Sequence, residues 1–146
     1  MKLKAALIVD NLKIENWQQS TLDAINSQID VVLILNCKNT KNKRAYVKNF
    51  LYYVLNIFSL RNYFTQKNKL RFASESILNF ESIYEGIWQS FPKKVYGILE
   101  DKNVDIVIKF GMSLLRISDK LSAPIFSFHH GDPSKYRGRP GGFYEI

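Results

Sequence analysis

Apolar residues gather in short runs along the first quarter of the chain. Residues 5–9 are all apolar and end at Asp10, which is typical of a strand buried on both faces of a parallel sheet. Over residues 15–28, apolar side chains recur every three or four positions, which predicts an amphipathic helix. A second apolar run at residues 29–35 predicts another buried strand. The three segments together indicate a β-α-β unit.

This unit also predicts where a ligand binds. Open sheets of parallel strands bind their ligands beyond the carboxyl ends of the strands. Asp10 and Asn11 follow the first predicted strand, and Asn36 and Cys37 follow the second. We therefore expect the ligand site near these four residues.

The middle of the chain is harder to interpret. Residues 44–60, from Arg44 to Leu60, predict a basic amphipathic helix with a wide apolar face. The simpler interpretation packs this helix on the sheet, and the alternative is peripheral contact with a membrane or a partner. Residues 61–89 show no sustained period and predict mostly connection.

The pattern becomes regular again after residue 90. Pro92 suits the first turn of a helix that continues to about Leu99. Residues 105–111 and 124–128 predict two further strands, with a short helix near residues 118–121 between them. The chain is thus predicted to be a single Rossmann-like, three-layer α/β domain with a mainly parallel sheet, spanning residues 1–146.

Composition adds limits to this interpretation. With 46% hydrophobic and 14% aromatic residues, the 146-residue chain has enough apolar surface to fold around one core. The net charge of +8 favours anionic partners, such as a phosphorylated small molecule or tRNA. No apolar run approaches the ~20 residues of a transmembrane helix, so none is expected. The single cysteine, Cys37, favours a cytoplasmic location.

Residues 129–146 differ sharply from the rest of the chain. They contain both histidines and four of the seven glycines, together with two arginines and two of the four prolines. A loop of this kind after a buried strand lies at the carboxyl edge of the sheet, where binding and catalytic residues concentrate. Backbone requirements explain the Gly and Pro residues, but they do not explain two His residues and Asp132 beside them.

The end of the chain resembles the folate-dependent formyltransferases, which include the glycinamide ribonucleotide, methionyl-tRNA and aminosugar enzymes. Their hallmark is Asn-x-His, a short Pro/Ser-rich turn and then Tyr-Arg-Gly. In this chain, Ser127-Phe128-His129 stands at the place of Asn-x-His, and Tyr136-Arg137-Gly138 follows at the family's distance. Residues 105–115 loosely resemble the family's Asp-plus-apolar strand, which ends near a Gly. The strong match covers about the last twenty residues.

The resemblance implies transfer of a formyl group from 10-formyltetrahydrofolate to an amino group, with tRNA or an aminosugar conjugate as acceptor. Protonated His129 would stabilise the tetrahedral oxyanion and pass a proton to the leaving folate nitrogen. The family's second oxyanion donor is an Asn, and here its position holds Ser127, whose hydroxyl is shorter. His129 and Ser127 are therefore the predicted catalytic residues.

Other residues of the segment are predicted to bind the two substrates. Gly111, His130 and Asp132 are assigned to the folate co-substrate, although His130 also fits a structural role. The predicted substrate-binding residues are Tyr136, Arg137, Gly138 and Arg139. The two arginines suit a phosphate or the glutamate tail of a folate, while Arg137 equally suits a structural role holding the loop.

Two alternatives follow from departures from the family pattern. The family's catalytic Asp lies beyond residue 146, so we expect the chain to be the front part of a longer protein, incomplete at its C-terminus. If the chain lacks that Asp, a non-catalytic anion- or folate-binding module is the alternative function.

A metal site on His129, His130 and Asp132 is disfavoured, because no Cys, Glu or further His lies nearby to complete it.

Overall fold

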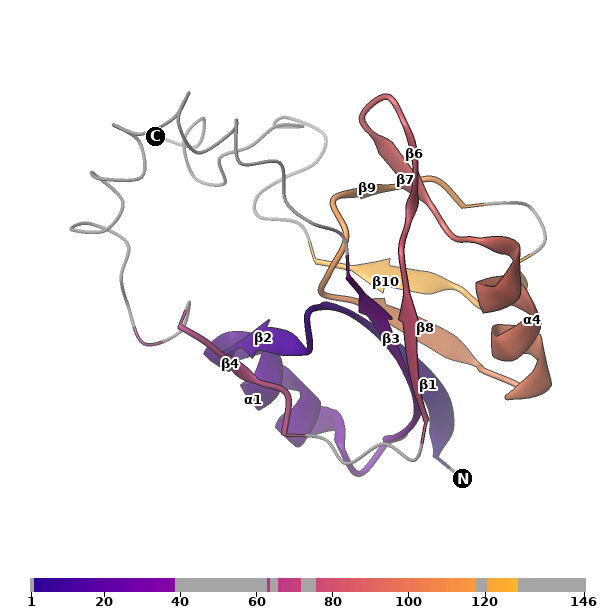
Figure 1. The fold of residues 1–146 in the computed structure, drawn as a ribbon. Coiled ribbons are helices and arrows are strands. Elements are labelled where there is room, and N and C mark those ends of the chain that lie inside the picture. The colour runs from indigo at the N-terminus through magenta and orange to yellow at the C-terminus, as the bar shows by residue number, and fades with distance from the viewer. Residues whose placement is uncertain (1, 39–62, 64–65, 72–75, 118–120, 129–146) are drawn as a thin grey trace, which may run out of the picture.

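The computed structural model describes residues 2–38, 63, 66–71, 76–117 and 121–128. The described elements are, in chain order, β1 (Leu3–Asp10), β2 (Lys13–Glu15), α1 (Asn16–Ile25), β3 (Ile29–Cys37), β4 (Lys67–Lys69), β5 (Ile77–Phe80), β6 (Ile83–Glu85), β7 (Trp88–Ser90), α4 (Lys93–Asp101), β8 (Ile106–Lys109), β9 (Leu114–Leu115) and β10 (Ile125–Ser127). Figure 1 shows their arrangement.

A seven-stranded sheet organises the molecule. β1 lies at its centre, with β3 and β8 as parallel neighbours; β5 pairs with β3 and β10 with β8, both in parallel. At the carboxyl end of β1 the chain turns back into β2, which pairs antiparallel with β1 and with β4. A smaller sheet has the order β6-β7-β9 and contains one antiparallel and one parallel pair.

The two helices cover opposite faces of the parallel strands (Figure 1). Leu22 of α1 packs with Leu7, Val9 and Ile34 in one buried cluster. Val95 and Leu99 of α4 pack in the other cluster, which includes Ile8, Leu33 and Val107. Residues 5–9 of β1 are fully buried because they lie between these two clusters, and this explains their uninterrupted apolar run.

Local signals in the sequence fix where each helix begins. In α1, the Glu15 side chain accepts from the backbone N–H three residues later, while Gln18 Oε1 accepts from the Glu15 backbone at 2.8 Å. This reciprocal capping satisfies two N–H groups that have no partner within the helix. Pro92 lies directly before α4 in an extended conformation, which suits its fixed φ angle and its missing N–H.

The predicted fold class, a Rossmann-like three-layer α/β domain with a mainly parallel sheet, is wrong. In the described residues, strands greatly exceed helices, and the two helices have only 10 and 9 residues. The sheets mix parallel with antiparallel pairs. The expectation failed because short polar strands such as β2 and β4 have no apolar run to reveal them, although they pair as strands.

The individual elements that the sequence predicts agree with the structure better than the predicted fold class does. The strands predicted at residues 5–9, 29–35, 105–111 and 124–128 and the helices predicted at 15–28 and after Pro92 are confirmed with shifted ends. The prediction of mostly connection over residues 61–89 is wrong, because β4, β5, β6 and β7 lie there. The predicted helix over residues 44–60 and most of the one near 118–121 lie outside the described residues. None of the helices that the structure describes is long and apolar enough to cross a membrane.

Candidate functional site

The tight turn between β1 and β2 forms one side of the candidate site. Asp10 pairs with Lys13, so only Asn11 and Leu12 make the turn. Their φ angles are 54° and 52°, the left-handed values that two-residue hairpin turns require. For Leu12 this conformation is unfavourable, so contacts from the rest of the fold must hold it.

Asn36 of β3 supplies such a contact. Its side chain is 1% exposed, and its Oδ1 accepts a hydrogen bond of 2.9 Å from the Leu12 backbone N–H. Its Nδ2 donates to Asn79 Oδ1 on β5 at 2.7 Å. The carbonyl of Cys37 accepts from the Asn11 backbone N–H at 3.2 Å. The end of β3 thus holds the turn in place. Asn36 and Cys37 support the turn, but they do not line the pocket described below.

The segment after β8 packs closely against the end of β1. A Cβ added at Gly111 would lie 2.6 Å from the Val9 carbonyl carbon and 2.8 Å from both the backbone N and the Oδ1 of Asp10. The same Asp10 oxygen accepts from the Met112 backbone N–H at 3.0 Å. Gly111 is therefore required by backbone packing, and it lines neither of the two pockets described below.

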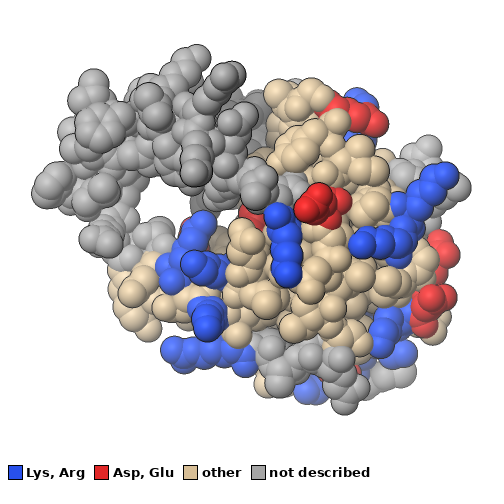
Figure 2. All heavy atoms as spheres, viewed as in Figure 1, with Lys and Arg blue, Asp and Glu red and all other residues tan. Residues whose placement is uncertain are grey.

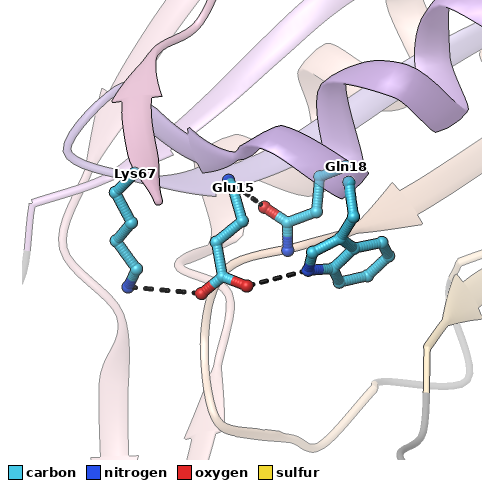
Figure 3. A network of polar contacts seen from close by, with 4 residues as sticks. Glu15, Gln18 and Lys67 are labelled. Atoms are coloured by element: carbon cyan, nitrogen blue, oxygen red, sulfur yellow. Dashed lines mark hydrogen bonds and ion pairs between the residues drawn. The ribbon is translucent and has the colours of Figure 1, made fainter. Parts of the chain in front are cut away.

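A polar pocket of about 300 Å³ lies over the β1–β2 turn. Its lining combines two acidic, two basic, two amide and one aromatic side chain: Asp10, Glu15, Lys13, Lys67, Asn11, Gln18 and Phe110. Figure 3 shows Glu15 at the centre of a polar network. Its carboxylate accepts from the Trp17 indole N–H at 2.8 Å and lies 4.0 Å from the Lys67 ammonium.

Phe110, which lines this pocket, belongs to a cluster of three aromatic rings. Trp17 of α1 makes edge contacts with Phe110 and Phe128, with ring centroids 5.9 and 5.3 Å apart. Phe110 and Phe128 stack on each other at 5.4 Å. The cluster ties the start of α1 to the ends of β8 and β10, and Phe128 remains 46% exposed.

A second pocket of about 220 Å³ lies beside Ser127. Its other lining residues are mainly apolar: Trp88, Leu114, Leu115, Ile117, Ile125, Lys109 and Ser113. Ser127 is the register partner of Lys109 on the neighbouring parallel strand. Register partners project to the same face of a sheet, so the Ser127 and Lys109 side chains start from the same face at this pocket.

The structure places only part of the predicted site. Ser127 lies at the end of β10 and lines the second pocket, whereas Gly111 has the packing role given above. The assignment of Gly111 to the co-substrate stays a prediction. His129, His130, Asp132, Tyr136, Arg137, Gly138 and Arg139 lie outside the described residues.

Sequence reasoning missed several residues of both pockets. Lys13, Glu15 and Lys67 come from short strands. The alternation of Lys-Ile-Glu over residues 13–15 is a signal for the first two only, and the all-polar β4 offers none for Lys67. Lys109 lies within a predicted strand, and only the register with β10 brings it beside Ser127.

Among the residues that the structure describes, no three His, Cys, Asp or Glu side chains lie close enough together to hold a metal ion. No family model, curated protein or solved structure matches the chain.

Proposed function

We propose that the protein transfers a formyl group from 10-formyltetrahydrofolate to the amino group of an acceptor, with the reaction taking place beside Ser127. The acceptor is an aminosugar conjugate or methionyl-tRNA. A cytoplasmic location belongs to the same proposal, since the chain has a single cysteine, Cys37.

The observation that carries the proposal is the position of Ser127. This residue stands where the resembled family has its oxyanion-binding Asn, and it lines the largely apolar second pocket. Folate carries a flat heterocycle, which suits a pocket with mainly apolar walls and a few polar groups. His129 follows two residues later in the sequence.

The chemistry assigns a role to each group. The acceptor nitrogen attacks the formyl carbon, and the carbonyl oxygen becomes an oxyanion that the Ser127 hydroxyl stabilises. The nearby Lys109 ammonium lowers the energy of the same negative charge. The bond from the formyl carbon to the folate nitrogen then breaks, and protonated His129 supplies the proton that this nitrogen takes up. The acceptor nitrogen releases one proton in return, so the step is balanced.

The first test is His129→Ala, assayed by release of tetrahydrofolate in the presence of an aminosugar nucleotide or methionyl-tRNA. We expect the rate to fall by about 100-fold or more, as for loss of a general acid. The control is Lys94→Ala, an exposed position on α4 that lines neither pocket, which should retain the full rate. Undiminished transfer by the His129 variant would rule out the mechanism.

The second candidate function is a binding module that holds the folate without turnover. The shorter side chain of Ser127 in place of Asn favours it, because one oxyanion donor is then weaker. Folate binding measured by fluorescence, with no transfer to either class of acceptor, would establish this function instead of the first.

A further inference from the structure

Three lysines lie on one face of the paired strands β2 and β4. Lys13 is the register partner of Lys69, and Glu15 is the partner of Lys67. Directly opposed residues of an antiparallel pair project to the same side, and so do alternate residues along each strand. Ile14, between Lys13 and Glu15, projects to the other side and is 2% exposed in the core. We call Lys13, Lys67 and Lys69 the lysine face.

The positive charge of this face is only partly compensated. Within the described part of the chain, Lys67 has a carboxylate partner, Glu15 at 4.0 Å, but Lys13 and Lys69 have no ion-pair partner. Both are exposed, and like charges placed directly opposite each other destabilise a strand pair. Glu15 is itself engaged by the Trp17 indole. An anion bound between the lysines would relieve this repulsion.

The lysine face borders the first pocket. Lys13 and Lys67 both line it, next to the amide groups of Asn11 and Gln18, which can donate hydrogen bonds. Figure 2 shows Lys and Arg side chains gathered where β2, β4 and α1 lie in Figure 1. Positive charge, amide donors and a concave surface therefore meet at one place.

We propose that the lysine face and the adjoining pocket bind the phosphate group of a small phosphorylated molecule. Lysine binds phosphate as a compact point charge. The pocket, at about 300 Å³, has the size of a small-molecule site. A pocket of this volume has room for a small molecule but not for an extended polyanion such as RNA.

This site is separate from the one proposed for formyl transfer. The pocket bordered by the lysine face and the pocket beside Ser127 have no lining residue in common. Binding of the phosphate group therefore does not depend on the formyl-transfer proposal, and the two can fail independently.

The test is calorimetric titration of the 146-residue chain with inorganic pyrophosphate at low ionic strength, where screening is weak. The double variant Lys13→Gln/Lys69→Gln should weaken binding by about tenfold or more, because it removes two charged contacts. The matched control is Lys93→Gln/Lys94→Gln on α4, which lowers the net charge equally. Figure 1 shows α4 away from β2 and β4, so this control should retain the wild-type affinity.

A third variant reverses the sign of the effect. Glu15→Gln removes the carboxylate that competes for Lys67, and we expect it to tighten pyrophosphate binding. Equal losses in the two double variants would show that binding follows only the overall charge and would overturn the site. The absence of pyrophosphate binding by the wild-type chain would also overturn it, and so would an RNA oligonucleotide that binds through the lysine face while pyrophosphate does not.

Discussion

At the scale of single residues, Gly111 shows how closely the chain after β8 approaches the end of β1. The backbone of Val9 and Asp10 leaves no space for a Cβ there. These obstacles are mostly backbone atoms, which cannot rotate away as the end of a side chain can. Gly97 differs, because a Cβ added at this position in α4 would have no neighbour within 4 Å.

This contrast gives a paired prediction. Gly111→Ala should lower the free energy of unfolding by about 1–3 kcal/mol or more, the usual range for overpacking. Gly97→Ala should raise it by about 0.4–1 kcal/mol, since alanine restricts the unfolded chain and favours the helix. Urea unfolding of both variants measures the two effects. Equal stability of Gly111→Ala and the wild type would mean that this close approach does not exist in solution.

At the scale of elements, the β1–β2 hairpin depends on β3. The turn residues Asn11 and Leu12 both have positive φ angles. Acceptor oxygens on β3 take a hydrogen bond from the backbone N–H of each. The hairpin carries Lys13 and Glu15 into the first pocket. The buried Asn36 side chain therefore determines the shape of this pocket without lining it.

Removing the Asn36 amide should release the turn. Asn36→Ala leaves the Leu12 N–H without its acceptor, which should cost about 1–3 kcal/mol of unfolding free energy. Hydrogen exchange at the Leu12 amide should become faster than in the wild type. Asn79→Ala breaks the contact of Asn36 with β5 but keeps the acceptor for Leu12, so this amide should stay protected. The idea fails if Asn36→Ala leaves the exchange of Leu12 unchanged.

At the scale of the whole molecule, one sheet joins two buried clusters. Alternate residues of β1 belong to different clusters, with Leu7 on the α1 side and Ile8 on the α4 side. The two helices therefore pack on the same strands, although they share no cluster. Such an arrangement should unfold as one unit.

Truncation of one helix at a time tests this coupling. Leu22 and Leu99 are 0% and 2% exposed, so Leu22→Ala and Leu99→Ala should each lower the free energy of unfolding by about 2–5 kcal/mol. Each should shift a single transition that circular dichroism and tryptophan fluorescence report together. Separate transitions for the two probes in either variant would show that the clusters are independent.

The sequence predicted the buried framework well and the polar elements poorly. The strands at residues 5–9 and 29–35 are confirmed because burial on both faces demands an uninterrupted apolar run. Of the four residues near which a ligand was predicted, Asp10 and Asn11 line the first pocket, and ligand binding there stays a prediction. β2 and β4 escaped prediction because each has only three residues and its stability comes from its partners. The Rossmann-like fold class failed with them.

The sequence by itself determined the buried strands at residues 5–9 and 29–35, where the two described helices begin and that the end of β1 is polar. These properties depend on composition and periodicity within one segment, so the residues of that segment are enough to predict them. Only the tertiary structure decided that Lys109 lies beside Ser127, that Lys13 faces Lys69 and that Asn36 supports Leu12. Strand register and long-range hydrogen bonds create these contacts, and they join segments that lie far apart in the sequence.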